Sequence, residues 1–170
     1  MRRTLINICM LGALAAMPLA GMISAAVPVG GDAVVEAAMS GNRDAVRTLL
    51  KDGADVNTAQ ADGMTALHWA AQKGDIELAK VLLYASANVR ATTRIGGYTP
   101  LLIASRNGDA AMIETLVGAG ADANTATTNG TTALMLAAAA GKVDAVKVLL
   151  AKGANVNAKE NVKGETALTF

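Results

Sequence analysis

The chain repeats itself at intervals of 33 or 34 residues, and this period constrains its fold more than any other feature. A Gly-x-Thr-x-Leu motif occurs four times in phase, beginning at Gly63, Gly97, Gly130 and Gly164. A second glycine keeps the same spacing after short alanine-rich runs, at Gly41, Gly74, Gly108 and Gly141. Repeated units of this length stack into a solenoid in which each copy packs against its neighbours.

The residue types within each copy predict a turn followed by two helices. The threonine of the motif is suited to cap the first helix, Pro100 fits a first helical position, and the motif leucine is expected to face the core. Apolar residues at helical spacing predict the second helix in two copies, at Ile76, Ala79, Leu82 and Leu83 and at Val143, Val146, Leu149 and Leu150. Left-handed glycines are expected to end second helices at Gly53, Gly120 and Gly153.

On these motifs the chain resembles the ankyrin-repeat family. Residues 65–71, Thr-Ala-Leu-His-Trp-Ala-Ala, are close to the family's Thr-Pro-Leu-His-x-Ala pattern. The resemblance implies an all-α solenoid of stacked helix-turn-helix units with short β-turn fingers. It implies one domain over 27–170, with about four full repeats at 30–62, 63–96, 97–129 and 130–163 and a partial fifth at 164–170.

Some copies depart from the pattern. In the first copy, Asp32 takes the capping place of Thr65 and Val34 takes the place of Leu67, as suits a terminal repeat. The third copy and the stretch that leads into it are the weakest. Ser86 stands where other copies have a helix-ending glycine, Arg90 stands where they have asparagine, and the turn at Ile95-Gly96 is one residue longer. These changes mark either a functional turn or ordinary drift.

The fifth copy supplies only a few residues before Phe170, too few for a first helix. The open face of the fourth copy therefore has two explanations. Either the natural chain is longer, or the terminal segment packs there irregularly.

Residues 1–26 are predicted to be a secretory signal peptide. Arg2 and Arg3 form a basic start, an apolar stretch covers 5–23, and the small residues 24–26 offer a cleavage site. We expect secretion across an inner membrane into the periplasm, with no membrane contact after cleavage, and a monomeric protein. The alternative is an uncleaved membrane anchor, because the apolar stretch is just long enough to span a bilayer.

Charge and composition argue against several functions. The 15 basic and 14 acidic residues become 13 and 14 once Arg2 and Arg3 are removed, a balance that does not favour nucleic acid as a partner. Cys9, the only cysteine, lies in the signal segment, and His68 is the only histidine, so no zinc site is expected. The resemblance implies that His68 is structural and bonds backbone groups of the neighbouring turn.

Acidic residues near the starts of second helices are explained by the helix dipole: Asp44, Asp75, Asp109 and Asp144. We therefore expect no catalytic residue, no cofactor and no metal, and the chain is not expected to be an enzyme.

Ankyrin proteins usually contact partners through their turn tips and first helices, so the resemblance places the candidate protein-binding residues there. They are Ala61, Asp62, Met64, Gln72 and Lys73 in the second copy, Arg94, Ile95, Tyr98, Arg106 and Asn107 in the third, and Thr128, Asn129 and Thr131 in the fourth. The third copy is the expected centre, because tyrosine and arginine often dominate binding energy. The alternative is that Tyr98 is an ordinary turn residue. Packing is the favoured role for Trp69.

The resemblance implies a non-catalytic module or scaffold that binds a protein partner, whose identity the sequence does not give. Some exported bacterial ankyrin proteins resemble accessory factors of periplasmic enzymes such as catalases, and this role is the first hypothesis. The alternative is a secreted effector or inhibitor that acts on a host or competitor protein.

Overall fold

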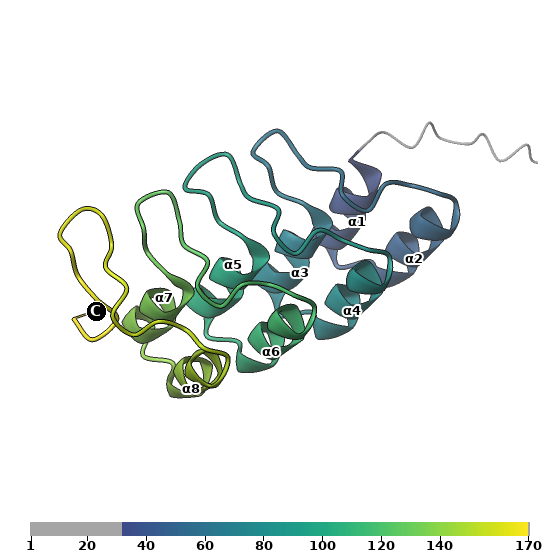
Figure 1. Ribbon diagram of the computed structural model, residues 1–170. Coiled ribbons are helices and arrows are strands. Elements are labelled where there is room, and N and C mark those ends of the chain that lie inside the picture. The colour runs from purple at the N-terminus through teal and green to yellow at the C-terminus, as the bar shows by residue number, and fades with distance from the viewer. Residues whose placement is uncertain (1–31, 170) are drawn as a thin grey trace, which may run out of the picture.

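The computed structural model describes residues 32–169 and contains eight helices in that range, arranged as four pairs. Figure 1 shows the pairs stacked side by side, with looped fingers that project from the inner row. The predicted all-α solenoid is confirmed. The predicted signal segment, Gly30 and Phe170 lie outside the described residues. The helices are α1 (Ala33–Ser40), α2 (Arg43–Lys51), α3 (Ala66–Lys73), α4 (Ile76–Tyr84), α5 (Pro100–Asn107), α6 (Ala110–Gly118), α7 (Ala133–Ala139) and α8 (Val143–Ala151).

The core lies between the two rows of helices. The inner helices α1, α3, α5 and α7 each pack on the next, and α4, α6 and α8 do so in the outer row. The prediction that the motif leucine faces the core holds for three of the four copies, because Leu168 is 94% exposed. Leu67, Leu101 and Leu134 are buried, and Val34 takes the same place in α1. Full burial of one such side chain contributes about 1.5–3 kcal/mol. Buried alanines on the inner helices leave room for this close packing.

Four fingers project beyond the inner helices: the second (residues 58–65), third (91–99), fourth (125–132) and fifth (158–166). Antiparallel bridges join Ala59 to Thr65 and Ala126 to Thr132, which accords with the predicted β-turn fingers. Neighbouring fingers are joined near their tips by one backbone hydrogen bond each. The donors and acceptors are Arg94 N–H to Asp62 O (2.8 Å), Thr128 N–H to Gly96 O (3.0 Å) and Asn161 N–H to Asn129 O (2.9 Å).

The capping predictions for the first helices hold in part. The hydroxyls of Thr99 and Thr132 each accept a backbone N–H at 3.3 Å in the first turn of α5 and α7. In α3 the Thr65 hydroxyl instead lies 2.8 Å from His68 Nδ1. Asp32 occupies the cap position of α1, but its side chain forms no capping bond.

The acidic residues of the outer helices divide into two groups. Asp75 and Asp109 cap α4 and α6, and each accepts a backbone N–H three residues on. Asp44 and Asp144 instead lie at the second position of α2 and α8. The sequence interpretation grouped all four, because each lies within three residues of the glycine that precedes its outer helix.

Two apolar residues of α8 are more exposed than predicted. Val143 is 63% exposed and Leu150 42%, whereas Leu149 is fully buried. Within residues 32–169 no further helix covers the outer side of α8, as α6 covers α4. Thr166, Ala167 and Leu168 instead border an apolar recess of about 280 Å³ beside Leu150.

Asparagine side chains tie the bases of neighbouring fingers together at two of three junctions. Asn57 Oδ1 accepts Asn88 N–H at 2.7 Å between the second and third fingers. Asn124 Oδ1 accepts Asn155 N–H at 2.7 Å between the fourth and fifth. Arg90 stands at the corresponding position between the third and fourth, beside a recess of about 310 Å³ that Asp122 also lines. The bases of these two fingers therefore lack the tie that asparagine makes elsewhere.

Replacing Ser86 by glycine is expected to stabilise the protein by about 0.5–1 kcal/mol. Ser86 has a φ of +67°, the only positive φ of a non-glycine residue among the described residues. The left-handed conformation costs such a residue roughly 1–2 kcal/mol, and the greater freedom of an unfolded glycine offsets about 0.4–1 kcal/mol of the gain. Urea unfolding measures the difference.

The adjacent Ala85 provides the control, because its φ of −79° suits alanine. Ala85→Gly is expected to destabilise the protein. A loss of stability in both variants would contradict strain at Ser86.

Candidate functional site

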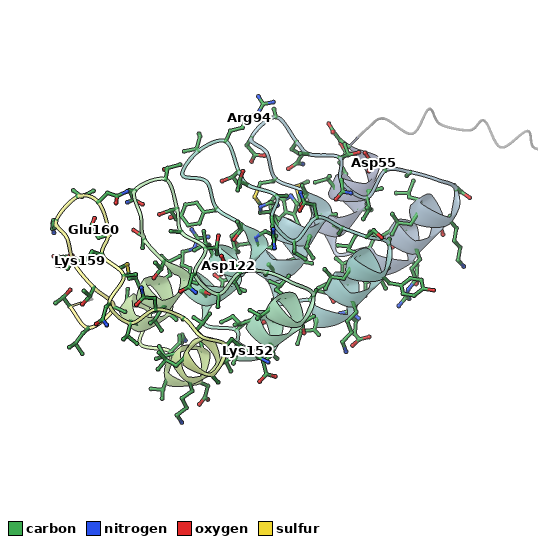
Figure 2. The ribbon with its side chains drawn as sticks, viewed as in Figure 1. Asp55, Arg94, Asp122, Lys152, Lys159 and Glu160 are labelled. Carbon is green, nitrogen blue, oxygen red and sulfur yellow. The ribbon has the colours of Figure 1, made fainter. Side chains whose placement is uncertain are left out.

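A depression of about 230 Å³ lies between the second and third fingers and the helices beneath them. Its lining comes from both fingers and from α3 and α5: Asp62, Met64, Gln72, Thr93, Ile95, Tyr98, Ile103 and Arg106. Figure 2 shows Arg94 among the finger tips, on the side of the molecule away from Lys152 at the end of α8. The depression therefore opens on the finger side of the inner helices.

Tyr98 forms part of the depression, and its backbone is held on both sides. Its N–H donates to Thr93 Oγ1 at 3.0 Å. Its carbonyl accepts the Thr93 N–H at 2.9 Å and also bonds His68 Nε2 at 3.0 Å. A Cβ at Gly96 would lie 2.7 Å from the Tyr98 ring, so the ring packs directly against that glycine.

Arg106 lies over the Tyr98 ring, with its guanidinium carbon 5.3 Å from the ring centroid. Its Nη2 donates to Gln72 Oε1 at 3.1 Å. The next residue, Asn107, donates from Nδ2 to the Gln72 carbonyl at 3.2 Å. A cation-π contact of this kind contributes about 0.5–1 kcal/mol at an exposed site. Tyr98, Arg106 and Gln72 thus form one connected cluster across two repeats.

His68 fixes the third finger to α3. The ring is fully buried, and Nδ1 accepts the Thr65 N–H at 3.1 Å. Because Nδ1 is an acceptor, Nε2 carries the proton and donates to the Tyr98 carbonyl. Burial lowers the pKa of His68, although the bond to Tyr98 opposes this in part. These contacts match the structural role that the resemblance implied for His68.

The stability of the protein is expected to fall as the pH drops below about 6.5, the ordinary histidine value of the unfolded chain. The folded-state pKa of His68 lies below that value, so the unfolded chain binds the proton first. The stabilisation is therefore complete above the unfolded pKa and is lost as the pH falls toward the folded pKa. Urea unfolding from about pH 7.5 to about pH 5.5 tests this, because carboxyl groups titrate lower. Equal stability across that range would contradict a buried neutral His68.

Six of the thirteen candidate residues line the depression. They are Asp62, Met64, Gln72, Ile95, Tyr98 and Arg106. Arg94 is exposed on the third finger, and Lys73 and Asn107 lie at the ends of α3 and α5.

Three candidates, Thr128, Asn129 and Thr131, lie one finger further along and do not line the depression, and neither does Ala61 on the second finger. Asn129 Oδ1 accepts the Thr131 hydroxyl at 3.2 Å, a contact within the fourth finger. These two residues therefore belong to the adjoining surface.

Two lining residues were missed by the sequence interpretation. Ile103 is 3% exposed and forms the floor, and Thr93 lies on the finger wall. Ile103 occupies the same phase as Trp69, so the repeat did contain a signal for it. Trp69 itself is half-buried, packs against the core, and donates from Nε1 to Gln60 Oε1 at 3.2 Å.

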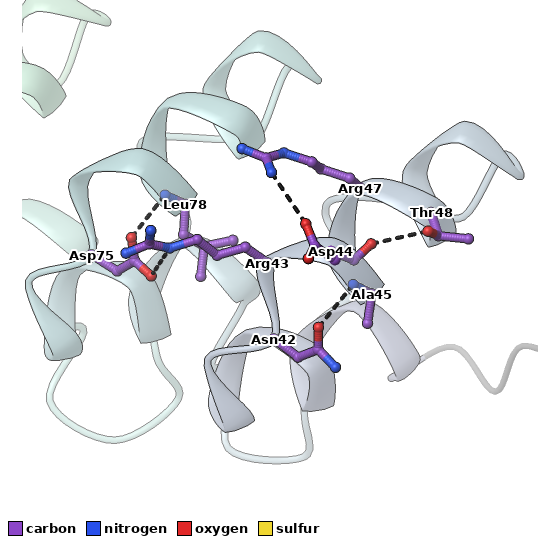
Figure 3. Close-up of polar contacts among 8 residues, drawn as sticks. All are labelled: Asn42, Arg43, Asp44, Ala45, Arg47, Thr48, Asp75 and Leu78. Carbon is purple, nitrogen blue, oxygen red and sulfur yellow. Dashed lines mark hydrogen bonds and ion pairs between the residues drawn. The ribbon is translucent and has the colours of Figure 1, made fainter.

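The outer surface carries charged side chains whose partners are already present. Figure 3 shows Arg43 reaching from α2 to Asp75 at the start of α4, with an N–O distance of 2.7 Å. Burial opposes ionisation of Asp75, but bonds from Arg43 and the Leu78 N–H outweigh it and lower the pKa. Arg47 pairs with Asp44 at 3.3 Å. These contacts account for the charges as ion pairs and helix caps.

Two other kinds of feature are absent from residues 32–169. No group of three or more His, Cys, Asp or Glu side chains there is placed to hold a metal ion. No helix in that part of the chain combines the length and apolar character needed to cross a membrane.

Comparison with known proteins places the repeat in a family. The profile "Ankyrin repeats (3 copies)" matches residues 101–170, and "Ankyrin repeats (many copies)" matches residues 34–83 and 68–117. Over 132 residues, 78% of its length, the chain is 36% identical to neurogenic locus notch homolog protein 1 of Xenopus laevis. The identity is 37% over the same span with that protein of Mus musculus. The chain spans 5% of the length of each of these relatives.

A shorter match covers 77 residues, 45% of the chain. It is 42% identical to protein fem-1 homolog A-like of Mus musculus, of which it spans 12%. The similarity to all these proteins is therefore confined to a small part of each.

Proposed function

Because the chain belongs to the ankyrin-repeat family, whose members are in general non-catalytic protein-interaction modules, we propose that it binds a partner protein in an extracytoplasmic compartment. The observation that carries this proposal is the cluster of Tyr98, Arg106 and Gln72 between two fingers. Tyrosine and arginine are enriched among residues that dominate binding energy. The role we propose is that of an accessory factor or scaffold for a periplasmic enzyme.

The amino-terminal sequence supports the proposed compartment. Arg2 and Arg3, the apolar stretch 5–23 and the small residues 24–26 follow the order of a secretory signal. Cell fractionation of the full chain with a carboxy-terminal tag tests the location, and mass spectrometry gives the mature terminus. Recovery in the cytoplasm with residues 1–26 intact would contradict export. Recovery in the medium would favour the secreted effector or inhibitor instead.

Affinity capture from the corresponding cell fraction tests the binding surface. The full chain is compared with Tyr98→Ala, Arg94→Ala and Tyr84→Ala. Tyr84 is the matched control, because its ring is 96% exposed on the outer helix α4. We expect Tyr98→Ala to lose the partner that wild type and Tyr84→Ala retain, and Arg94→Ala to bind it more weakly. Equal recovery by all four proteins would show that the partner binds elsewhere.

A further inference from the structure

Resting on the proposed function, we infer that the depression binds one apolar side chain of a partner segment that carries a carboxylate beside it. The occupant is thus an acidic, leucine- or phenylalanine-bearing stretch of protein. Four properties of the depression lead to this partner: its size, its lining, its unpaired cations and its rigidity.

The size of the depression indicates that it holds a single side chain of the partner. Pockets for drug-sized molecules usually measure roughly 300–1,000 Å³, and the depression measures about 230 Å³. Such a volume suits one large apolar side chain, with the rest of the partner segment lying across the fingers.

The residues that line the depression favour an apolar side chain as its occupant. Ile103 forms a buried floor, Met64 and Tyr98 are half-buried, and Ile95 on the third finger is 84% exposed. An apolar side chain placed among them removes apolar surface from water on both partners, which stabilises the complex by about 25 cal/mol for each Å² buried.

The cationic side chains beside the depression favour a partner that carries a carboxylate. Of the 13 cationic side chains in residues 32–169, five form ion pairs and eight, Arg94 and Arg106 among them, form none. Asp62 is the one acidic residue in the lining, and its Oδ1 accepts the Met64 N–H at 2.9 Å. The cations therefore outnumber the acid here, whereas the described residues as a whole carry 13 basic and 14 acidic groups.

The cluster is held in place before any partner arrives. Arg106 is positioned by the Tyr98 ring and by Gln72. The bond to Gln72 uses one of the five N–H donors of the Arg106 guanidinium. The remaining donors can bind a carboxylate in the two-point geometry that arginine favours. Binding then requires little ordering of this side chain, and that reduces the entropic cost of association.

The probes that test this inference are three pools of short synthetic peptides in a Gly/Ser background. The first pool has a central Leu or Phe flanked by Asp or Glu, the second has the same centre flanked by Lys or Arg, and the third has acidic flanks around Ala. Fluorescence polarisation with the purified full chain measures binding. We expect the first pool to bind at least about tenfold more tightly than either of the others.

Variants assign the binding to the depression. Tyr98→Ala and Arg106→Gln should each weaken binding of the first pool by about tenfold or more. Tyr84 and Arg47 lie on the outer helices, so the variants Tyr84→Ala and Arg47→Gln should bind the first pool as tightly as wild type does. Arg106→Glu should reverse the preference toward the basic pool, a gain that misfolding cannot produce.

The outcomes separate this inference from the proposed function. Equal binding of the acidic and basic pools, or binding unchanged in Tyr98→Ala and Arg106→Gln, overturns the inference. If the peptides give that result but Tyr98→Ala still loses the partner in affinity capture, the proposed function stands and only the inference about the partner's chemistry is wrong. If the first pool binds as expected but wild type captures no partner, the chemistry of the depression stands and the proposed function fails.

Discussion

Gly63→Ala is expected to lower the free energy of unfolding by about 2 kcal/mol and to displace the third finger. Gly63 has a φ of +87°, and a Cβ there would lie 2.9 Å from Arg94 N and 3.0 Å from Thr92 O. Both are backbone atoms, so no side-chain rotation relieves the contact. Left-handed alanine costs roughly 1–2 kcal/mol, and the smaller freedom of the unfolded alanine variant offsets about 0.4–1 kcal/mol of this cost. Loss of the 2.8 Å bond between Arg94 N–H and Asp62 O adds about 1 kcal/mol.

Gly53→Ala is the matched control for this change. Its φ is +86°, nearly that of Gly63, but a Cβ there meets nothing within 4 Å. The control should therefore lose only the net backbone strain of about 0.5–1 kcal/mol. Urea unfolding of both variants isolates the contact between fingers. Equal losses would show that this contact contributes nothing to stability.

Replacing His68 by leucine is expected to cost about 2 kcal/mol of stability. Leu102 occupies the equivalent position of the next repeat, in α5, so a helix of this kind accommodates a leucine there. The substitution leaves the Thr65 N–H without its acceptor and removes the bond to the Tyr98 carbonyl. A buried donor left without a partner costs about 1–3 kcal/mol. The Tyr98 carbonyl still accepts the Thr93 N–H, so losing its bond to His68 costs less than leaving the Thr65 N–H unpaired.

Met135→Leu provides the comparison, because Met135 has the same phase in α7. Its sulfur is only a weak acceptor for the Thr132 N–H, at 3.4 Å. This control should lose less than about 1.5 kcal/mol. His68→Leu should also abolish the fall in stability between about pH 6.5 and pH 5.5 that wild type is expected to show. Persistence of that slope in the variant would assign it to another group.

The repeat predicted the fold because its signals are local. A glycine, a threonine two residues on and a leucine two further on specify a turn, a cap and a buried side chain without reference to distant residues. The same phase identified Ser86 as a position where a left-handed residue was needed, and its φ of +67° agrees. The exposure of Val143 on α8 could not be inferred in this way. Val143 matches Ile76 in sequence, but its surroundings depend on what packs beyond α8.

The depression could be predicted only in outline. The resemblance pointed to finger tips and first helices, and six residues chosen on that basis do converge. The contact of Arg106 with both Tyr98 and Gln72 depends on how far one repeat is rotated against the next. Periodicity within a single copy carries no information about that rotation. Ile103 was overlooked for a related reason, since a buried floor residue reads as core in the sequence.

The absence of an asparagine tie at Arg90 makes the junction between the third and fourth fingers different from its two neighbours. The second and third fingers remain joined through Asn57 at their bases, as do the fourth and fifth through Asn124. Between these halves only the bond from Thr128 N–H to Gly96 O holds the finger tips together. At this junction the two repeats are therefore held together mainly by the packing of α5 with α7 and of α6 with α8. A ligand confined to the depression would contact two fingers that are tied at both base and tip, whereas one that extends to Asn129 would cross the junction that lacks the basal tie.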